Sequence, residues 1–244
     1  SSIMLERPYR KRRIEHVIRD IHAIREFRKR PFIELADDNT FVDKKWSRDL
    51  CHALIPEKIK WFTETDITVA EDDELLRLLR KARCRQLLIG LESPAPEDLA
   101  GVELKTDFKR RSASDYAADV RKIQDAGVTV NGCFVLGLDH HGPDIFQRVY
   151  DFAMSVPLFE VQVTVMTPFP GTPLYQRLLD EGRILQPGRW DLCTLFDVNF
   201  QPRQMTVDEL RRGLFWLVEK LYSAGCTYQR RLPVLRNLWL SSGG

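Results

Sequence analysis

The sequence predicts an α/β protein in which parallel strands alternate with helices. Five short apolar runs are centred near residues 34, 62, 89, 133 and 163, and segments with helical periodicity separate them, as in successive βαβ units. The runs are largely apolar, which is typical of parallel strands covered on both faces. This pattern allows either a complete or partial (β/α) barrel or an open doubly wound sheet. Either fold accommodates the 244 residues as one main domain.

Each element follows from its local pattern. Apolar residues on one helical face, among them Ile14, Val17 and Ile21, predict the first helix at 14–28. Acids open the helix predicted at 71–82 and cations close it, and Gly127 ends the helix predicted at 114–127. Further helices are predicted at 46–54 and 144–156, and strands at 31–36, 59–64, 86–93, 128–138 and 160–166.

The C-terminal region has weaker periodicity. Its clear helix lies at 206–223, where Thr206 and Glu209 have the spacing of a capping box. We therefore expect a barrel core over 1–181 and an extension over 182–244 that packs on it, with 240–244 as linker or tag.

Composition restricts the class of protein. Hydrophobic residues make up 43% of the chain, but no stretch approaches the roughly 18 apolar residues of a membrane span, so no transmembrane segment is expected. The 37 Lys and Arg nearly balance the 35 Asp and Glu, so the overall charge favours neither nucleic acid nor a membrane surface as partner. Five scattered cysteines without a C-x-x-C pair predict no local metal site and suit a reducing cytoplasm.

Ligands of α/β proteins collect at the carboxyl ends of the strands. Every predicted strand ends in polar or glycine-rich residues: Asp37, Asp38 and Asn39; Glu64, Thr65 and Asp66; Glu92 and Ser93; Asp139, His140 and His141; and Thr167, Pro168, Pro170 and Gly171. The candidate binding residues among them are Asp37, Asp38, Asn39, Thr65, Glu92, Ser93, Asp139, Thr167, Pro168, Pro170 and Gly171. The adjacent histidines are not expected to bind a metal together.

Several of these residues have a structural alternative. Asp37–Asn39 equally suit a turn or a helix N-cap. Glu92 follows an apolar run, so its carboxylate must find a partner or a ligand. Gly132 and Gly137 mark either a close approach to a ligand or a bulge.

Two basic segments and one proline-rich turn complete the set. The run at 9–13 is expected to be a solvated loop. In the long connection after the third strand, Lys105, Lys109, Arg110 or Arg111 could supply a cation for a carboxylate ligand. In "TPFPGTP", the prolines fix φ, Gly171 allows the bend, and Thr172 and Pro173 start a helix.

The ordered motifs "ADDN", "IGLES", "GCFVLGLD" and "TPFPGTPLY" resemble the radical S-adenosylmethionine family. They are most similar to the branch with an upstream cobalamin-binding domain, which includes enzymes acting on hopanoids and tetrapyrroles. The resemblance runs from about Arg10 to Leu221. It implies a partial (β/α) barrel that lacks the family's first strand.

The resemblance also implies cofactors. Members of the family bind S-adenosylmethionine and hold a [4Fe–4S] cluster on a CxxxCxxC loop. That loop is absent here, so we expect it upstream of Ser1 in a longer protein, together with a cobalamin-binding domain. Whether cobalamin is used is left open. An external electron donor is a further expected partner.

Carried over by motif, the resemblance assigns a role to most of the candidates. Asp38 and Asn39 match the site of the methionyl amino group, with Asp37 and Thr65 beside them; Glu92 and Ser93 match a contact to ribose or the methionyl part. The segment with Gly132, Phe134 and Gly137 matches a backbone contact to adenine, which Thr167–Gly171 would flank. Asp139 stands near a glutamate of many members.

The implied reaction is hydrogen-atom abstraction from an unactivated carbon of a small molecule, followed by methylation, rearrangement or cyclisation. This chain alone is expected not to cleave the cofactor, since it lacks the cluster loop. Aromatic residues near 190–200 suggest an apolar substrate and equally suit packing. Two other functions stay open: a barrel hydrolase or lyase using Asp37, Glu92 and Asp139 as acid and base, and a non-catalytic nucleotide-binding scaffold. Nucleic acid is not an expected partner.

Overall fold

The computed structural model describes residues 10–94 and 113–240, and the alternating order of elements is as predicted. None of the helices in these ranges is long and apolar enough to cross a membrane. The helices are α1 Ile14–Phe27, α2 Lys44–Leu54, α3 Asp73–Lys81, α4 Ala113–Asp125, α5 Ile145–Ser155, α6 Pro173–Asp180, α7 Val207–Tyr222 and α8 Ala224–Leu240, with 3-10 turns η2 Ile67–Glu71 and η5 Trp190–Leu192. The strands are β1 Phe32–Leu35, β2 Lys60–Thr65, β3 Cys84–Glu92, β4 Thr129–Leu136 and β5 Glu160–Val165.

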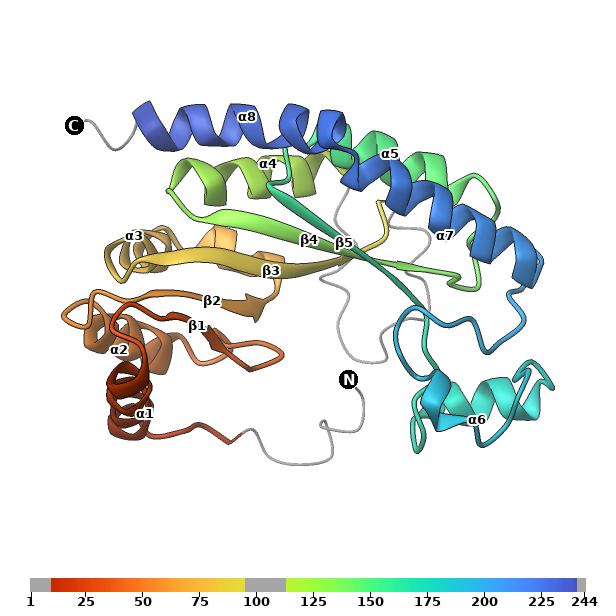
Figure 1. Cartoon of the computed structure of the whole chain (residues 1–244), viewed down its shortest axis with the longest axis horizontal. Coiled ribbons are helices and arrows are strands. Elements are labelled where there is room, and N and C mark those ends of the chain that lie inside the picture. Colours follow the sequence, from red (N-terminus) through yellow and green to blue (C-terminus); the bar gives the residue numbers. More distant parts are fainter. Residues whose placement is uncertain (1–9, 95–112, 241–244) are drawn as a thin grey trace.

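The five strands form one parallel sheet whose spatial order, β1-β2-β3-β4-β5, is the order of the sequence. A doubly wound sheet reverses direction at a switch point, and this sheet does not. Successive right-handed crossovers in one direction place all their helices on the same face. The sheet therefore curls into a partial barrel, with α1 and α2 beside β1 and β2, and α4 and α5 over β4 and β5 (Figure 1).

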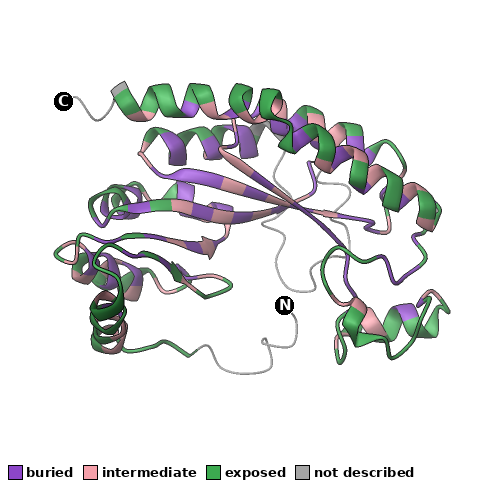
Figure 2. Cartoon of the chain, in the orientation of Figure 1, coloured by how far each residue is buried: buried purple, intermediate pink, exposed green. Residues whose placement is uncertain are grey.

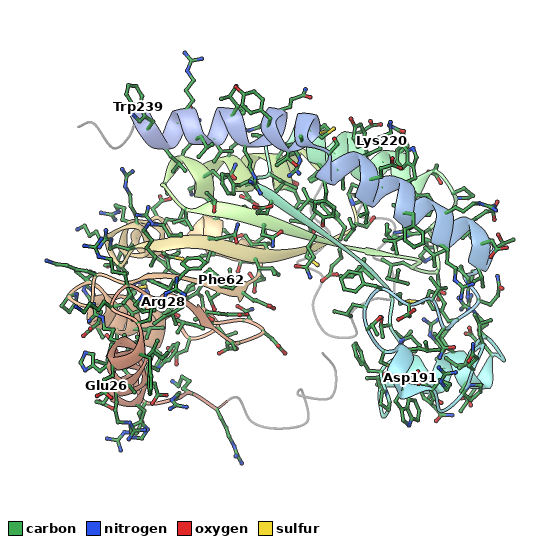
Figure 3. The ribbon with its side chains drawn as sticks, in the orientation of Figure 1. Glu26, Arg28, Phe62, Asp191, Lys220 and Trp239 are labelled. Carbon is green, nitrogen blue, oxygen red and sulfur yellow. The ribbon has the colours of Figure 1, made fainter. Side chains whose placement is uncertain are left out.

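The two faces of the sheet differ in polarity. In β2, the buried Trp61, Thr63 and Thr65 alternate with Lys60, Phe62 and Glu64, which are more exposed. Figure 2 shows the same alternation of buried and half-buried residues along β3 and β4. Phe62, labelled in Figure 3, stacks on Phe32 of β1 with 5.4 Å between ring centroids. The sequence predicted strands that are buried on both faces. In the structure only the face toward the helices is fully buried, and the residues of the other face are half-buried or exposed.

Local signals placed the helix ends correctly. The Thr206 hydroxyl accepts a hydrogen bond from the Glu209 amide at 3.1 Å, and the Thr206 amide donates to the Glu209 carboxylate at 2.7 Å, which is the predicted capping box. Thr172 caps α6 through the Tyr175 amide, with Pro173 at the first helical position. Gly127 has φ +95°, the left-handed conformation expected after a helix.

The last helix, α8, was not predicted, because Pro233 lies inside it and its apolar periodicity is weak. It packs against α4, α5 and α7. Arg230, only 2% exposed, donates to the main-chain oxygens of Leu158 at 3.2 Å and Leu221 at 2.9 Å, so its guanidinium joins α8 to the start of β5 and the end of α7. The boundary placed between residues 181 and 182 remains a prediction.

The outer edges of the two edge strands differ in their hydrogen bonding. Along β5, the Tyr222 hydroxyl donates to the Val161 oxygen at 2.8 Å, and the Val165 amide donates to the Leu195 oxygen at 2.7 Å. Among the described residues β1 pairs only with β2, so its other edge carries no strand. The sheet is therefore closed off on the β5 side and open on the β1 side.

The contact between α5 and α7 provides a test of this packing. A Cβ atom added at Gly213 would lie 2.1 Å from two ring atoms of the buried Phe146. We expect Gly213→Ala to lower the free energy of unfolding by about 1–3 kcal/mol through overpacking, although alanine is the better helix former. Urea denaturation followed by far-UV circular dichroism measures this change.

Gly225 in α8 is the matched control, because a Cβ atom there meets no heavy atom within 4 Å. Gly225→Ala should leave stability unchanged or raise it slightly. Equal stability of the two variants would contradict the close approach of α5 and α7.

Candidate functional site

The carboxyl ends of the five strands meet at one edge of the parallel sheet. The first two ends are joined by side chains: Asn39 Nδ2 donates to Asp66 at 2.7 Å, and the Thr65 hydroxyl donates to Asn39 Oδ1 at 3.1 Å. The Asn39 amide also donates to Asp37 Oδ1 at 3.2 Å, which makes the turn that the sequence allowed. The N-cap of α2 is instead Asp43. Asn39 therefore holds the two strand ends in register and keeps only part of its polar groups for a ligand.

Four carboxylates gather where β1 and β2 end. Burial raises the pKa of Glu64, and the negative charges of Asp38, Glu34 and Asp37 raise it further. Such a cluster favours the uptake of a proton or of a cationic ligand. Sequence reasoning named Asp37 and Asp38 as candidates but not Glu34, and it noted Glu64 without assigning it a role. A signal for both residues was present in the sequence. The two-residue repeat of β1 and β2 places Glu34 and Glu64 on the face of the sheet that points away from the helices.

Glu92 ends β3 in an unusual conformation. Its φ is +63°, and the pairing of β3 with β4 shifts register between Gly90 and Glu92. A Cβ atom at Gly90 would lie 2.8 Å from Glu92 Oε1, so the carboxylate lies over the glycine. Ser93 is fully buried, and its amide donates to the Leu91 oxygen at 2.8 Å. Gly90, which sequence reasoning missed, thus provides the space for the predicted Glu92.

The residues predicted on β4 pack on the helix side of the sheet. A Cβ atom at Gly132 would lie 2.9 Å from side-chain atoms of both Leu158 and Leu91, and Phe134 is fully buried against Phe152. The missing side chain at Gly132 thus has a packing reason, and the ligand-based reason that the sequence suggested remains a prediction. A backbone contact from this strand to a ligand stays a prediction.

Gly137 and the proline turn lie just beyond the strand ends. Gly137 has φ +85°, and a Cβ atom there would lie 2.9 Å from the ring of Phe200. The Thr167 hydroxyl is buried and donates to the Val165 oxygen at 2.9 Å, whereas Pro170 and Gly171 are exposed. Gly171 has φ +76°, which agrees with the bend expected there. The exposed part of the turn is the part that remains accessible to a ligand.

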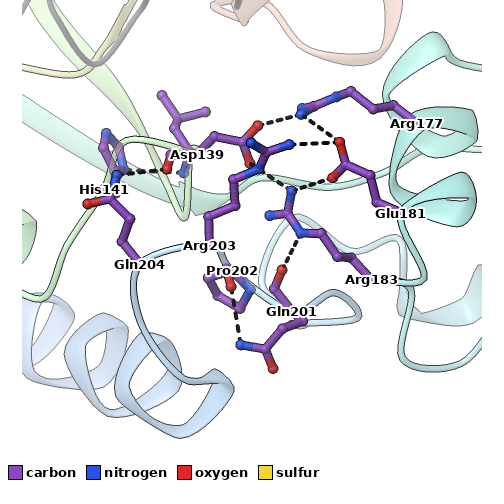
Figure 4. A network of polar contacts seen from close by, with 10 residues as sticks. Asp139, His141, Arg177, Glu181, Arg183, Gln201, Pro202, Arg203 and Gln204 are labelled. Atoms are coloured by element: carbon purple, nitrogen blue, oxygen red, sulfur yellow. Dashed lines mark hydrogen bonds and ion pairs between the residues drawn. The ribbon is translucent and has the colours of Figure 1, made fainter.

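Asp139, after β4, is engaged in a network of ion pairs (Figure 4). Its carboxylate contacts Arg177, Arg183 at 2.9 Å and Arg203 at 3.5 Å. Glu181 accepts from Arg183 at 2.8 Å and from Arg203 at 2.7 Å. Burial raises the pKa of Asp139, but the hydrogen bonds from Arg177 and Arg183 outweigh burial and hold it below its usual value. Asp139 is therefore an anion that fastens α6 and the segment after it to the barrel, which does not suit an acid catalyst.

A groove of about 330 Å³ lies between α1, β1 and α2 and reaches the acidic cluster. Ile21, Ile33 and Trp46 form apolar walls, and Glu34 and Asp37 line its polar part. Apolar and acidic surfaces are thus adjacent at the open edge of the sheet. Lys109 and the other candidate cations of that connection lie outside the described residues.

The five cysteines do not converge. Cys51 and Cys84 are buried in the core, and burial raises the pKa of the Cys51 thiol to about 12. The described residues contain no group of three or more His, Cys, Asp or Glu side chains that could hold a metal ion. His140 and His141 accordingly form no such group, and the cysteines of this chain do not fit the ligand set of an iron–sulfur cluster.

The Asp139 network predicts a pH-dependent contribution to stability. Asp139→Asn should lower the free energy of unfolding at neutral pH by about 1–2 kcal/mol, because it weakens charged hydrogen bonds to the nearly buried Arg183. A carboxyl whose pKa is lowered on folding stabilises above its ordinary pKa, here 3.8, and loses that contribution as the pH falls further. The difference between variant and parent, measured by urea denaturation, should therefore shrink below about pH 3.8.

Asp191→Asn serves as control, since Asp191 is exposed and its one ion-pair partner within the described part of the chain is Arg189, two residues earlier. It should change stability little at any pH. If Asp139→Asn behaved in the same way, the network would not fasten α6 to the barrel.

A family model described as "Domain of unknown function (DUF4070)" matches residues 172–242. The bacteriochlorophyllide d C-12(1)-methyltransferase of Chlorobaculum tepidum is 23% identical over 224 residues, 91% of this chain and 48% of that protein. The anaerobic magnesium-protoporphyrin IX monomethyl ester cyclase of Cereibacter sphaeroides is 26% identical over 223 residues, 88% of this chain and 35% of that protein. The chain thus spans half or less of the length of these relatives.

Among solved structures, the radical S-adenosylmethionine methyltransferase TsrM from Kitasatospora setae, with cobalamin and a [4Fe–4S] cluster bound, superposes with a TM-score of 0.62 and 14% identity. The match covers 95% of this chain and 56% of TsrM. At 14% identity this likeness establishes the fold alone. The sequence relatives add a likeness to tetrapyrrole-modifying enzymes, which belong to the branch expected from the motifs. The resemblance of this chain to the cobalamin-associated radical S-adenosylmethionine enzymes is therefore confirmed, in its partial barrel and in its sequence.

Proposed function

We propose that the strand-end site binds S-adenosylmethionine and that the chain is the barrel core of a radical S-adenosylmethionine enzyme. The observation that carries this proposal is the acidic cluster of Glu34, Asp37, Asp38 and Glu64 at the mouth of the partial barrel. The methyltransferase and the cyclase that the chain resembles support a reaction on an organic molecule. The reaction is abstraction of hydrogen from an unactivated carbon, followed by methylation, rearrangement or cyclisation.

The charges of the cofactor match the cluster. S-adenosylmethionine carries a sulfonium and an ammonium cation, and nearby carboxylates in a partly desolvated site stabilise both of them. Asp38 and the Asn39 main chain are the proposed partners of the ammonium group. Glu92 and Ser93 are the proposed partners of ribose or the methionyl part.

The protein's own residues orient the cofactor and exclude water. When bound, S-adenosylmethionine supplies the radical chemistry, and the barrel supplies position and shielding. Asn39 keeps the ends of β1 and β2 together, and the Asp139 network holds the segment after β5 against the barrel. We assign the exposed Pro170 and Gly171 to one wall of the adenine site, where a fixed backbone limits motion.

No step through an iron–sulfur cluster is assigned to this chain, because its cysteines do not fit one. We propose that the cluster ligands, and a cobalamin-binding domain if cobalamin is used, belong to segments outside this sequence. The further partners in this proposal are an external electron donor and a small apolar substrate, and the proposed compartment is the cytoplasm. TsrM, which has the same fold, was solved with cobalamin and a cluster bound.

The hydrolase alternative is not favoured. It requires carboxyl groups that exchange protons, whereas Asp139 is ion-paired to arginines with a lowered pKa. A nucleotide-binding scaffold without catalysis has the same binding site as the proposed enzyme, and it differs from the enzyme in turnover.

Binding is tested by calorimetry with S-adenosylmethionine and with S-adenosylhomocysteine, which lacks the sulfonium charge. We expect the parent chain to prefer S-adenosylmethionine, and Glu64→Gln to reduce this preference by roughly two- to tenfold, because one partly exposed negative charge is lost. Asp38→Asn should weaken the binding of both ligands, since both carry the amino group.

Glu219→Gln is the matched control, because Glu219 is an exposed residue of α7. It should leave both affinities unchanged. Absence of S-adenosylmethionine binding, or equal affinity for both ligands in the parent chain, would refute the proposed site.

The role of missing cluster ligands is tested by anaerobic reconstitution of the chain with iron and sulfide. We expect no stable cluster and no formation of 5′-deoxyadenosine from S-adenosylmethionine. The measurements are the iron and sulfide content after desalting and chromatography of the products. A stable cluster that supports cleavage would overturn this part of the proposal.

A further inference from the structure

The end of the sheet opposite the site is rich in cations. Helices α1, α2 and α3 each lead into the next strand by a short turn, and these turns lie side by side at the edge where the strands begin. The first turn carries three exposed cations in succession, Arg28, Lys29 and Arg30. We name this edge, with the turns before β1, β2 and β3, the cationic end.

Further exposed cations lie close by: Lys58 in the turn before β2, Lys81 at the end of α3 and Arg85 at the start of β3. None of these six residues forms an ion pair with another described residue. The acid between them, Glu57, is engaged by Arg25 at 2.8 Å and by His22 at 3.0 Å, and its side chain is only 12% exposed. A net positive surface therefore remains, although Glu26 is exposed beside it.

Two aromatic side chains stand out at the same end of the molecule. Phe27, the last residue of α1, is 92% exposed and precedes the three cations directly. Trp239, near the end of α8, is 77% exposed. Asn237 donates to Asp125 at 3.4 Å, which holds the end of α8 at the turn before β4. In Figure 3, Trp239, Glu26 and Arg28 are labelled at one end of the long axis.

We propose that the cationic end binds the surface of an anionic lipid bilayer, with Phe27 and Trp239 inserted among the headgroups. Cations near an anionic leaflet attract it, and aromatic rings prefer the boundary between headgroups and acyl chains. An exposed aromatic residue next to three cations combines both features. The association is peripheral, and it leaves the strand-end site, at the opposite edge of the sheet, free to bind its own ligands.

The arrangement favours a bilayer over a nucleic acid strand. Single-stranded nucleic acid is bound in a basic groove with aromatic stacking platforms. The groove of about 330 Å³ near α1 is lined by Glu34 and Asp37 as well as by apolar residues, so it does not suit a polyanion. The cations here are instead spread over the turns before β1 and β2 and the ends of α3 and β3, as binding to a flat charged surface requires.

The test is co-sedimentation of the protein with vesicles of phosphatidylcholine alone and of phosphatidylcholine with phosphatidylglycerol. We expect binding to the anionic vesicles only, and its loss when the ionic strength is raised. The double substitution K29E/R30E should weaken binding at least about tenfold. Phe27→Ser and Trp239→Ser should each weaken binding at unchanged net charge.

The double substitution R212E/K220E is the matched control, because both residues are exposed cations of α7, away from the cationic end, and the change in net charge is the same. It should retain most of the binding. The proposal is overturned if the protein does not sediment with anionic vesicles, or if the two double variants lose binding equally. Two results together would also overturn it: a single-stranded RNA binds the protein and prevents its sedimentation with vesicles, and Phe27→Ser sediments with vesicles as well as the parent does.

Discussion

The direction of the chain through the sheet is the constraint on which the rest of the structure depends. Every crossover from β1 to β5 moves one strand further in the same direction, so the crossover helices cover one face. Among residues 10–94 and 113–240 no helix covers the opposite face, so polar side chains such as Glu34, Glu64 and Glu92 lie there without disturbing the core. A site with several carboxylates is possible here because the topology places the crossover helices on the other face.

Local patterns were enough to predict most of the fold. Periodicity and caps such as Thr206 with Glu209 and Thr172 with Pro173 act over a few residues, so the sequence displays them directly. The choice between a barrel and a doubly wound sheet depends on strand order, which no local pattern encodes. Helix α8 was missed for a related reason, since Arg230 stabilises it through partners 72 and 9 residues away.

The site was harder to predict than the fold. Glycine indicates that something approaches closely, but the sequence does not say what approaches: at Gly132 it is Leu158 and Leu91, and at Gly137 it is Phe200. In contrast, Gly90 accommodates a predicted site residue, Glu92. Net charge is similarly uninformative. The total of +2 conceals an acidic mouth and a cationic edge at opposite ends of the same strands.

The way α8 is fastened has a consequence for folding during synthesis. Each βα unit pairs with the unit made just before it, so contacts in the sheet form between neighbours in the sequence as the chain emerges. The contacts of α8 are different, because Asn237 joins Asp125 across 112 residues and Arg230 joins Leu158 across 72. Helix α8 can therefore dock only after the strands and helices that precede it have been made, and until it docks the main-chain oxygens of Leu158 and Leu221 lack the guanidinium of Arg230.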